Sequence, residues 1–338
     1  MKKRLYVVTG AMGHLGNTVV KSLLARGCRV RGFVLPSDRT GALEGTGAEL
    51  IYGDIRRRED LVPLFQTEPC EELTVIHTAG IVSISSKFRQ EVYDVNVTGA
   101  RHVLELCQRY QAAKLVHVSS VHAIPELPQG KTMTEVSSFS KEWVHGLYAQ
   151  TKAEATQLVL DQAAKGLNAS VVHPSGIIGP GDYGAGHLTQ LISDYCNGRL
   201  TAYIRGGYDF VDVRDVSDGI LSCMEQGLAG ESYILSNRYY TIGELLEELH
   251  RITGRKMLKT VLPSWFARLT APLSECYYRL RRQPPLYTSY SISALSGNAS
   301  FSHAKADREL GYHTRPLYDT LADTVKFLSG QKRISADG

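Results

Sequence analysis

The sequence predicts an α/β protein in which a parallel sheet is covered by helices on both faces. Short apolar runs rich in β-branched residues alternate with helical patterns along the first half of the chain, as expected for strands that are buried on both faces. These runs fall at residues 5–8, 30–35, 49–52, 74–77, 114–118 and 170–173. Such alternation is typical of a doubly wound sheet, whose ligands bind beyond the carboxyl ends of the strands.

The first apolar run leads into a glycine-rich turn, VVTGAMGHLG, in which Gly10, Gly13 and Gly16 are spaced three apart. Apolar residues with helical spacing follow it. Strand, turn and helix therefore come in the order that a dinucleotide-binding motif requires. We expect the diphosphate to lie on backbone N–H groups at the start of this helix, where the peptide dipoles favour negative charge.

A second motif, YAQTK, places Tyr148 and Lys152 four residues apart. On a helix these two side chains are neighbours on one face. A tyrosine with a pKa near ~10 exchanges protons poorly at neutral pH, and a fixed cation beside it stabilises the phenolate. The pair is therefore a candidate acid/base.

Size and composition exclude several functions. The chain has 338 residues and a formal charge of +4, which is too mild to indicate a nucleic-acid partner. The six cysteines are scattered, with no Cys-x-x-Cys pair, so we expect neither a metal site nor a disulfide framework. No stretch approaches the roughly 18 apolar residues of a membrane span. We expect a cytoplasmic protein.

The regular alternation of strand and helix patterns ends near residue 173, which divides the chain into two parts. Residues 1–173 are predicted to form the nucleotide-binding domain and residues 174–338 a smaller substrate-binding region, with about residues 208–236 returning to the large sheet. Thr241 and Glu244 have the spacing of a helix capping box. Apolar residues at 262–280 predict an amphipathic helix that forms a wall of the substrate pocket.

Together the motifs resemble the extended short-chain dehydrogenase/reductases, and the resemblance covers nearly the whole chain. VTGAMGHLG is similar to the TGxxGxxG turn of that family, YGDIRR to its acidic–hydrophobic pair, IHTAG to its strand-four motif, and VHVSSVHA to its active-site serine segment. HPSGIIGPGDY and FVDVRDVSDGI most resemble the dihydroflavonol 4-reductase and 3β-hydroxysteroid dehydrogenase branch. The resemblance implies a Rossmann-like sheet and an NAD(P)-dependent oxidoreductase acting on a small, mostly hydrophobic carbonyl or hydroxyl compound.

The resemblance also implies roles for individual residues. Tyr148 would exchange a proton with the substrate oxygen, and Lys152 would bind the nicotinamide ribose and lower the pKa of the phenol. Ser120 would donate a hydrogen bond to the substrate oxygen. Ser119 is the alternative, since register alone separates the two serines. Asn96 would support the active-site backbone.

The dinucleotide would be held by several parts of the chain. Asp54 would accept a hydrogen bond from the adenine amine, and residues 78–80 would pack under the adenine ribose. The expected cofactor-binding residues are Gly10, Met12, Gly13, His14, Leu15, Gly16, Arg39, Asp54, Ile55, Thr78, Ala79, Gly80, Asn96, Ser119, Tyr148, Lys152, Pro174 and Ile177.

The segment that should select between NAD(H) and NADP(H) departs from both patterns. An NAD-specific fold places an acidic residue about 20 positions after the glycines. That region reads FVLPSDR, with Leu35 and Pro36 in place of the acid. Arg39 could reach a 2′-phosphate and Asp38 could bind a ribose, so the sequence favours NADP(H) by a small margin.

Two other functions compete with a reductase. A nucleotide-sugar epimerase shares the fold and the Tyr/Lys pair but retains its NAD, and it needs cations for the sugar diphosphate. Arg199, Arg205, Arg214 and Arg238 are candidates for that role. A non-catalytic dinucleotide-sensing protein is the third possibility, although such relatives typically lose the Tyr/Lys pair. The long helices after Asn96 and Tyr148 would suit a homodimer.

Overall fold

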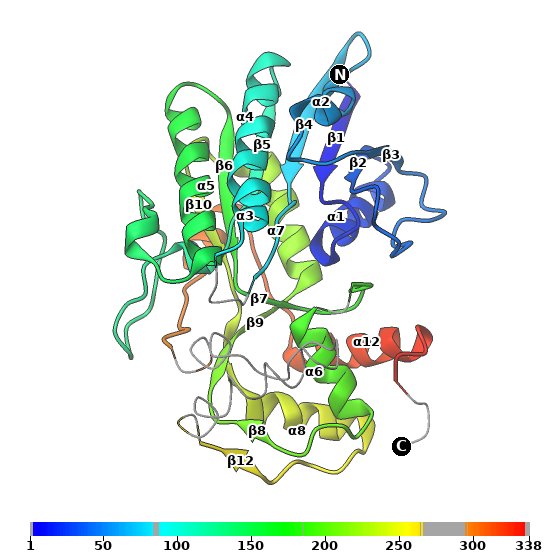
Figure 1. Ribbon diagram of the computed structural model, residues 1–338, viewed down its shortest axis with the longest axis vertical. Coiled ribbons are helices and arrows are strands. Elements are labelled where there is room, and N and C mark those ends of the chain that lie inside the picture. Colours follow the sequence, from blue (N-terminus) through cyan, green and yellow to red (C-terminus); the bar gives the residue numbers. More distant parts are fainter. Residues whose placement is uncertain are drawn as a thin grey trace.

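The computed structural model describes residues 3–83, 88–184, 186–263, 265, 295 and 297–334. Figure 1 shows a large sheet with flanking helices in the upper part of the molecule and a smaller region built from later residues below it. The amphipathic helix predicted at residues 262–280 lies almost entirely outside the described residues. Within the described ranges, no helix has both the length and the apolar character to cross a membrane.

The large sheet has seven parallel strands, which confirms the predicted fold class. The strands are β1 (Lys3–Thr9), β2 (Arg29–Val34), β3 (Glu49–Tyr52), β4 (Glu71–His77), β5 (Lys114–Val118), β6 (Ala169–Pro174) and β10 (Ser232–Leu235). Their order in space is β10-β6-β5-β4-β1-β2-β3. The direction of winding reverses between β1 and β4, and ligands of such sheets bind at that point.

Helices cover both faces of this sheet because its central strands are apolar on both sides. In β1, Leu5 and Val7 belong to one apolar core, whereas Val8 belongs to another. The core around Val8 is closed by α1 (His14–Ala25) and α7 (Val213–Gln226). The opposite core is closed by α4 (Gly99–Arg109) and α5 (Leu147–Ala164). Burial of these apolar side chains is the main stabilising term.

Short helical segments connect the strands. These are α2 (Arg58–Leu61), η1 (Val62–Phe65), α3 (Gln90–Tyr93), the π-helical η2 (Asp94–Thr98), η3 (Val121–Ala123) and η4 (Lys141–Trp143). The segment η3 directly follows β5 and precedes the loop that leads to α5.

The second region supplies a small sheet and three helices. The sheet contains β7 (Gly176–Ile178), β9 (Gly207–Asp212) and β11 (Arg238–Thr241), and the helices are α6 (His187–Cys196), α8 (Ile242–Thr253) and α12 (Leu317–Gly330). Smaller elements are β8 (Tyr203–Ile204), β12 (Val261–Leu262) and α11 (Ala304–Leu310). The α6, α8 and α12 helices enclose an apolar core of their own. Between β9 and β11 the chain passes through α7 to β10, at the edge of the large sheet.

The capping box predicted for α8 is present. The Thr241 side chain accepts a hydrogen bond from the backbone N–H of Glu244, and the Glu244 carboxylate accepts one from the backbone N–H of Thr241. Two backbone donors at the helix start are therefore satisfied locally, which is why the sequence could predict this boundary.

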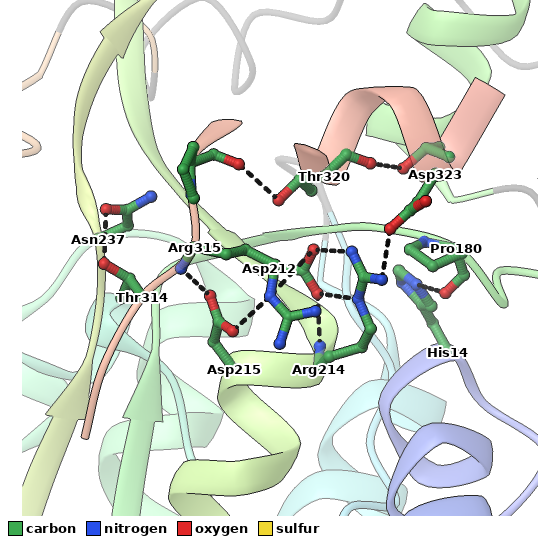
Figure 2. Close-up of polar contacts among 12 residues, drawn as sticks. His14, Pro180, Asp212, Arg214, Asp215, Asn237, Thr314, Arg315, Thr320 and Asp323 are labelled. Carbon is green, nitrogen blue, oxygen red and sulfur yellow. Dashed lines mark hydrogen bonds and ion pairs between the residues drawn. The ribbon is translucent and has the colours of Figure 1, made fainter. Parts of the chain in front are cut away.

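An ionic network around two buried carboxylates ties α12 to α7 (Figure 2). The Arg214 guanidinium binds both oxygens of Asp212, with Nε–Oδ1 and Nη2–Oδ2 distances of 3.0 and 2.7 Å, and reaches Asp323 of α12 at 2.6 Å. Arg315, which precedes α12, donates to Asp215 of α7 from its side chain at 2.7 Å and from its backbone at 2.8 Å. The C-terminal helix is thereby attached to the helix that covers the large sheet.

The carboxylates of this network depend on their arginines. The side chains of Asp212 and Asp215 are 0% and 4% exposed. Burial raises the pKa of Asp212, but the Arg214 hydrogen bonds outweigh it and hold that pKa below its ordinary value. A buried carboxylate that loses its cation destabilises the fold strongly, because its charge is then uncompensated.

Replacing Arg315 tests this dependence. In Arg315→Leu, the buried carboxylate of Asp215 loses its cation, and we expect the free energy of unfolding to fall by about 2–4 kcal/mol. Arg308→Leu is the matched control, because Arg308 pairs with Glu309 on the exposed surface, where such pairs contribute about 0–1 kcal/mol. Urea unfolding at neutral pH measures both. Equal losses in the two variants would show that the network adds no more than a surface pair.

Candidate active site

Two glycines of the predicted dinucleotide turn are required by close packing. Gly10 has a positive φ of 66°, and a Cβ there would lie 2.7 Å from the Ala79 Cα. A Cβ on Gly16 would lie 2.1 Å from the Gly10 carbonyl oxygen. Gly13 differs, because a Cβ there would meet only that same oxygen, at 3.2 Å. The space in front of Gly13 is therefore open.

The open space faces the start of α1. This helix begins at His14, no side chain caps it, and its first turn contains no acidic residue. The first backbone N–H groups of a helix have no partner within the helix, and the helix dipole makes this end positive. A cradle of backbone donors without an acidic neighbour in the turn fits an anionic diphosphate. The side chains of Met12 and Leu15 pack with the apolar core, which leaves only their backbone groups for the predicted contact with the cofactor.

His14 connects this turn to the loop that follows β7. Its Nε2 lies 3.1 Å from the Pro180 carbonyl oxygen, and Asn17 donates to the carbonyl oxygens of Gly13 and Gly181. Burial lowers the pKa of His14, which keeps the imidazole neutral at physiological pH. The loop after β7 is thus held against the predicted cofactor turn (Figure 2).

The residues after β4 lie beside the same turn. Thr78 Oγ1 donates to the Thr9 carbonyl oxygen at 2.6 Å, and the Ala79 backbone N–H lies 3.3 Å from Thr9 Oγ1. A Cβ on Gly80 would be 3.3 Å from Lys152 Nζ. The ends of β1 and β4 are therefore in contact with each other and with the helix that carries the candidate acid/base.

Asp54 and Ile55 lie after β3, at the same edge of the sheet. The Asp54 carboxylate accepts hydrogen bonds from the Arg56 side chain, with a 2.5 Å contact to Nη2, and these bonds hold the pKa of Asp54 below its usual value. Asp54 is thereby kept as an ionised acceptor. Ile55 is buried, and Gly99 leaves the space that its side chain fills.

Pro174 and Ile177 lie on the opposite side of the turn. Pro174 is the last residue of β6, and Ile177 is the middle residue of β7. The Ile177 side chain packs against the apolar core that also contains Leu15 and Val213. The sequence-predicted cofactor residues therefore come from the ends of the six strands β1 to β6, from β7, and from α1, α5 and η2.

Asn96 lies in a π-helical segment and joins two parts of the site. Its amide donates to the Ile81 carbonyl oxygen at 3.1 Å and to Thr151 Oγ1 at 3.0 Å, and its carbonyl oxygen accepts from the Ile81 N–H at 2.8 Å. Thr151 lies between Tyr148 and Lys152 on α5. π-Helical turns frequently occur at functional sites, because the extra residue re-aims a side chain.

The candidate acid/base pair lies in the first two turns of α5. Tyr148 and Lys152 are both buried, with 8% and 6% of their surfaces exposed. Lys152 Nζ donates to the Val118 carbonyl oxygen at 2.8 Å. Burial lowers the pKa of Lys152 to about 8, so the ammonium is still mostly charged at neutral pH. Tyr148 and Lys152 are four residues apart on α5, so their side chains leave the same face of the helix.

The two serines after β5 have different surroundings. Ser119 Oγ lies 2.6 Å from Thr156 Oγ1, inside the core. Ser120 Oγ accepts a hydrogen bond from the His122 N–H at 3.2 Å, which leaves its own O–H as a donor. His173 Nδ1 lies 3.1 Å from the Ser120 carbonyl oxygen and fixes this peptide. The surroundings therefore favour Ser120 over Ser119 for a bond to substrate.

Two residues near Tyr148 received no role from the sequence: His122, which was expected to lie near the site, and Tyr208, which was not considered. The His122 ring lies edge-on to the Tyr148 ring, with centroids 5.9 Å apart, and His122 Nε2 is 3.0 Å from the Tyr208 hydroxyl. The position of His122 two residues after Ser120 was a local signal. Tyr208 offered no local signal, because 86 residues separate it from His122.

Metal ligation has no support in the described part of the chain. No three His, Cys, Asp or Glu side chains there come together as a metal site.

Comparison with known proteins identifies the family. The NAD dependent epimerase/dehydratase family matches residues 6–236. The chain belongs to this family. It is also 34% identical, over 94% of its length and 96% of the relative, to "Sterol demethylase protein B" of Methylococcus capsulatus. The family membership confirms the resemblance to extended short-chain dehydrogenase/reductases and makes the protein an NAD(P)-dependent enzyme.

Other members give the same architecture. A "Putative dihydroflavonol 4-reductase" of Synechocystis is 29% identical and covers 95% of this chain and 93% of its own length. The crystal structure of the protein called gox2253 superposes with a TM-score of 0.84 at 29% identity, covering 98% of this chain and 99% of that one. The similarity therefore extends through both the large sheet and the second region.

Gly13→Val tests the cofactor turn of this family member. The backbone at Gly13 has φ −63° and ψ 164°, which any residue adopts, so the variant should fold. Its side chain would fill the open space before α1, and we expect dinucleotide binding to be lost. Fluorescence titration with NAD(P)H measures binding, and circular dichroism checks folding. Gly330→Ala, where a Cβ would meet nothing within 4 Å, is the control and should bind normally. Normal binding by Gly13→Val would remove the diphosphate from this turn.

Proposed function

We propose that the protein is an oxidoreductase that transfers hydride between NAD(P)H and a small, mostly hydrophobic carbonyl or hydroxyl substrate. One observation carries the proposal: Lys152 binds the carbonyl of Val118, and Tyr148 contacts His122, whose N–H binds Ser120. Acid/base, cation and hydroxyl donor are thus gathered at the carboxyl end of β5. That edge of a doubly wound sheet is where ligands bind.

Each of these side chains has a distinct task in the proposed reaction. Tyr148 gives its phenolic proton to the substrate oxygen during reduction and takes it back during oxidation. The Lys152 ammonium lowers the cost of the phenolate that this transfer leaves. Ser120 donates a hydrogen bond to the same substrate oxygen and so orients it toward Tyr148. When bound, the nicotinamide supplies the hydride for reduction or accepts it for oxidation.

The proposed cofactor site uses the residues predicted from the sequence. Backbone groups at the start of α1 would hold the diphosphate, and Asp54 would accept from the adenine amine. Gly80 would leave room for the ribose near Lys152, since any side chain there would crowd the ammonium. Asn96 would keep α5 in register with the segment after β4.

We propose NADP(H) as the preferred form of the cofactor. The Asp38 carboxylate accepts two hydrogen bonds from Thr40, each at 2.8 Å, which turns it toward its own loop. The Arg39 guanidinium lies over that loop, donating to the carbonyl oxygens of Pro36 and Asp38. This loop follows β2, where a 2′-phosphate would be recognised. A guanidinium suits a phosphate better than a ribose hydroxyl.

A nucleotide-sugar epimerase would need cations that bind the sugar diphosphate, and most of the arginines considered for that role are engaged within the protein. Arg214 is bound by Asp212 and Asp323. Arg238 stacks on the Tyr240 ring with its guanidinium carbon 3.7 Å from the ring centroid. Arg199 pairs with Asp194 at 3.4 Å. These three cations already have partners within the protein.

Arg205, the fourth candidate, lines a cavity among the described residues. The hollow has a volume of about 460 Å³ and is also lined by Gln129, Tyr239 and Asn298. A single arginine there would give the alternative function one contact to a sugar diphosphate. Retention of bound NAD is therefore the property that best separates the two functions.

The role of Tyr148 is tested by Tyr148→Phe. The substitution removes the acid/base and leaves the ring packing, so turnover should fall by at least ~100-fold. Cofactor affinity should remain close to that of the unsubstituted protein, because the phenolic oxygen is not part of the diphosphate cradle. Steady-state kinetics and NAD(P)H titration measure the two quantities. Turnover unchanged by the substitution would remove Tyr148 from the mechanism.

The state of the cofactor tests the reaction type. A reductase releases its nicotinamide in every cycle, so the purified protein should be largely cofactor-free and should oxidise one NAD(P)H for each carbonyl reduced. An epimerase recycles its hydride, so it should retain bound NAD and show no net consumption. A panel of aldehydes, flavanonols, hydroxysteroids and nucleotide sugars, assayed separately with NADH and NADPH, distinguishes these outcomes. Interconversion of a nucleotide sugar by protein with bound NAD would favour the alternative.

A further inference from the structure

A hydrogen-bonded aromatic pair lies next to the candidate acid/base. Tyr208, near the start of β9, and His122, in η3, are joined by the 3.0 Å contact between the tyrosine hydroxyl and the imidazole Nε2. Their ring planes are within 19° of each other, with centroids 5.7 Å apart. The two rings are therefore stacked, with nearly parallel planes. Both side chains are half-buried.

This pair comes from η3 and β9, two segments that supply none of the predicted cofactor residues. The predicted cofactor turn, Gly80 and Lys152 lie together beside the ends of β1 and β4. Tyr208 comes instead from the second region, and His122 meets the Tyr148 ring at an interplanar angle of 72°. The backbone of His122 also binds Ser120. The pair therefore adjoins both groups proposed to bind the substrate oxygen.

The Tyr208 ring is held in place by the β7 backbone and by two phenylalanine rings. A Cβ on Gly176 would lie 3.0 Å from Tyr208 Cδ1, so the absence of a side chain there lets the ring sit against the β7 backbone. Phe210 and Phe301 contact Tyr208 with ring centroids 6.2 and 6.3 Å away. A ring packed by glycine on one side and by aromatic rings on others has little freedom to move aside for a ligand.

The pair offers neutral groups only. Burial lowers the pKa of the His122 imidazole to about 4, so it carries no charge at neutral pH. An anion placed against neutral, partly desolvated rings would lose hydration without gaining a counter-charge. An apolar ring placed there would gain from burial and from contact with flat aromatic surfaces.

We propose that His122 and Tyr208 form the specificity wall of the substrate site, selecting a substrate whose body beside the reacting oxygen is an uncharged apolar ring and rejecting an anionic one. This inference rests on the proposed function, because it concerns the same site. It differs from that function in what it assigns: Tyr148, Lys152 and Ser120 act at the oxygen, whereas His122 and Tyr208 select the rest of the molecule.

Binding to protein that cannot turn over tests the wall directly. In a Tyr148→Phe background loaded with NADPH, calorimetry compares 4-tert-butylcyclohexanone with 4-oxocyclohexanecarboxylate, which share ring and carbonyl and differ in charge. The apolar ketone should bind more tightly. Tyr208→Ala should reduce this preference by at least about 10-fold, as expected when a pocket wall is lost. Tyr208→Phe, which keeps the ring, should retain most of it.

Controls separate this inference from the proposed function. Tyr318→Ala changes a tyrosine that is 47% exposed on α12 and should leave the preference unchanged. Where Tyr208→Ala fails to fold by circular dichroism, Tyr208→Leu replaces it, because leucine keeps apolar volume without the flat ring. A preference unchanged in the Tyr208 variants, or no preference before substitution, overturns the inference.

The proposed oxidoreductase activity is tested separately, by measuring turnover of the same two ketones by protein with Tyr148 intact. No turnover together with an intact, Tyr208-dependent preference contradicts only the proposed function. Turnover without that preference contradicts only the specificity wall.

Discussion

The site depends on the close contact between the ends of β1 and β4. Gly10 and Gly16 can carry no side chain because the Gly10 carbonyl and the Ala79 backbone occupy the space that a Cβ would fill. The chain leaves β1 toward one face of the sheet, where α1 packs, and leaves β4 toward the other, where α4 packs. The two departures open the edge of the sheet at one point. The helix start, the segment after β4 and the α5 side chains all meet there.

Helix α5, which carries Tyr148 and Lys152, is held against the strand ends by two hydrogen bonds. Asn96 joins Thr151 of α5 to the backbone after β4, and Lys152 joins α5 to the end of β5. Both contacts are buried, where hydrogen bonds are stronger because the local dielectric is low. Burial also lowers the pKa of Lys152 without removing its charge at neutral pH. A single helix therefore fixes the cation and the phenol relative to the strand ends.

The proposed substrate side comes from a different part of the chain, which an ionic network attaches to the large sheet. The β9 strand brings Tyr208 to His122 at its beginning and Asp212 to the ionic network at its end. That network attaches α12 to α7 (Figure 2), and α7 packs on α1, the helix that follows the predicted cofactor turn. One strand thus connects the proposed specificity wall with the attachment of the second region. Because β9 is continuous, the residues proposed to select the substrate keep a fixed position relative to the large sheet that carries the candidate acid/base.

The sequence by itself determined the features that depend on near neighbours: the strand–turn–helix order, the Tyr148/Lys152 spacing, the α8 capping box, and from these the fold class and family. Periodicity, turn chemistry and capping act over a few residues, so they are visible in the chain. Only the tertiary structure decided which serine lies free of Thr156, which arginines are bound by carboxylates, and that Tyr208 reaches His122. The contacts of Ser119 with Thr156, Tyr208 with His122 and Arg214 with Asp323 join residues 37, 86 and 109 positions apart. Their energies depend on burial and packing that no local pattern records.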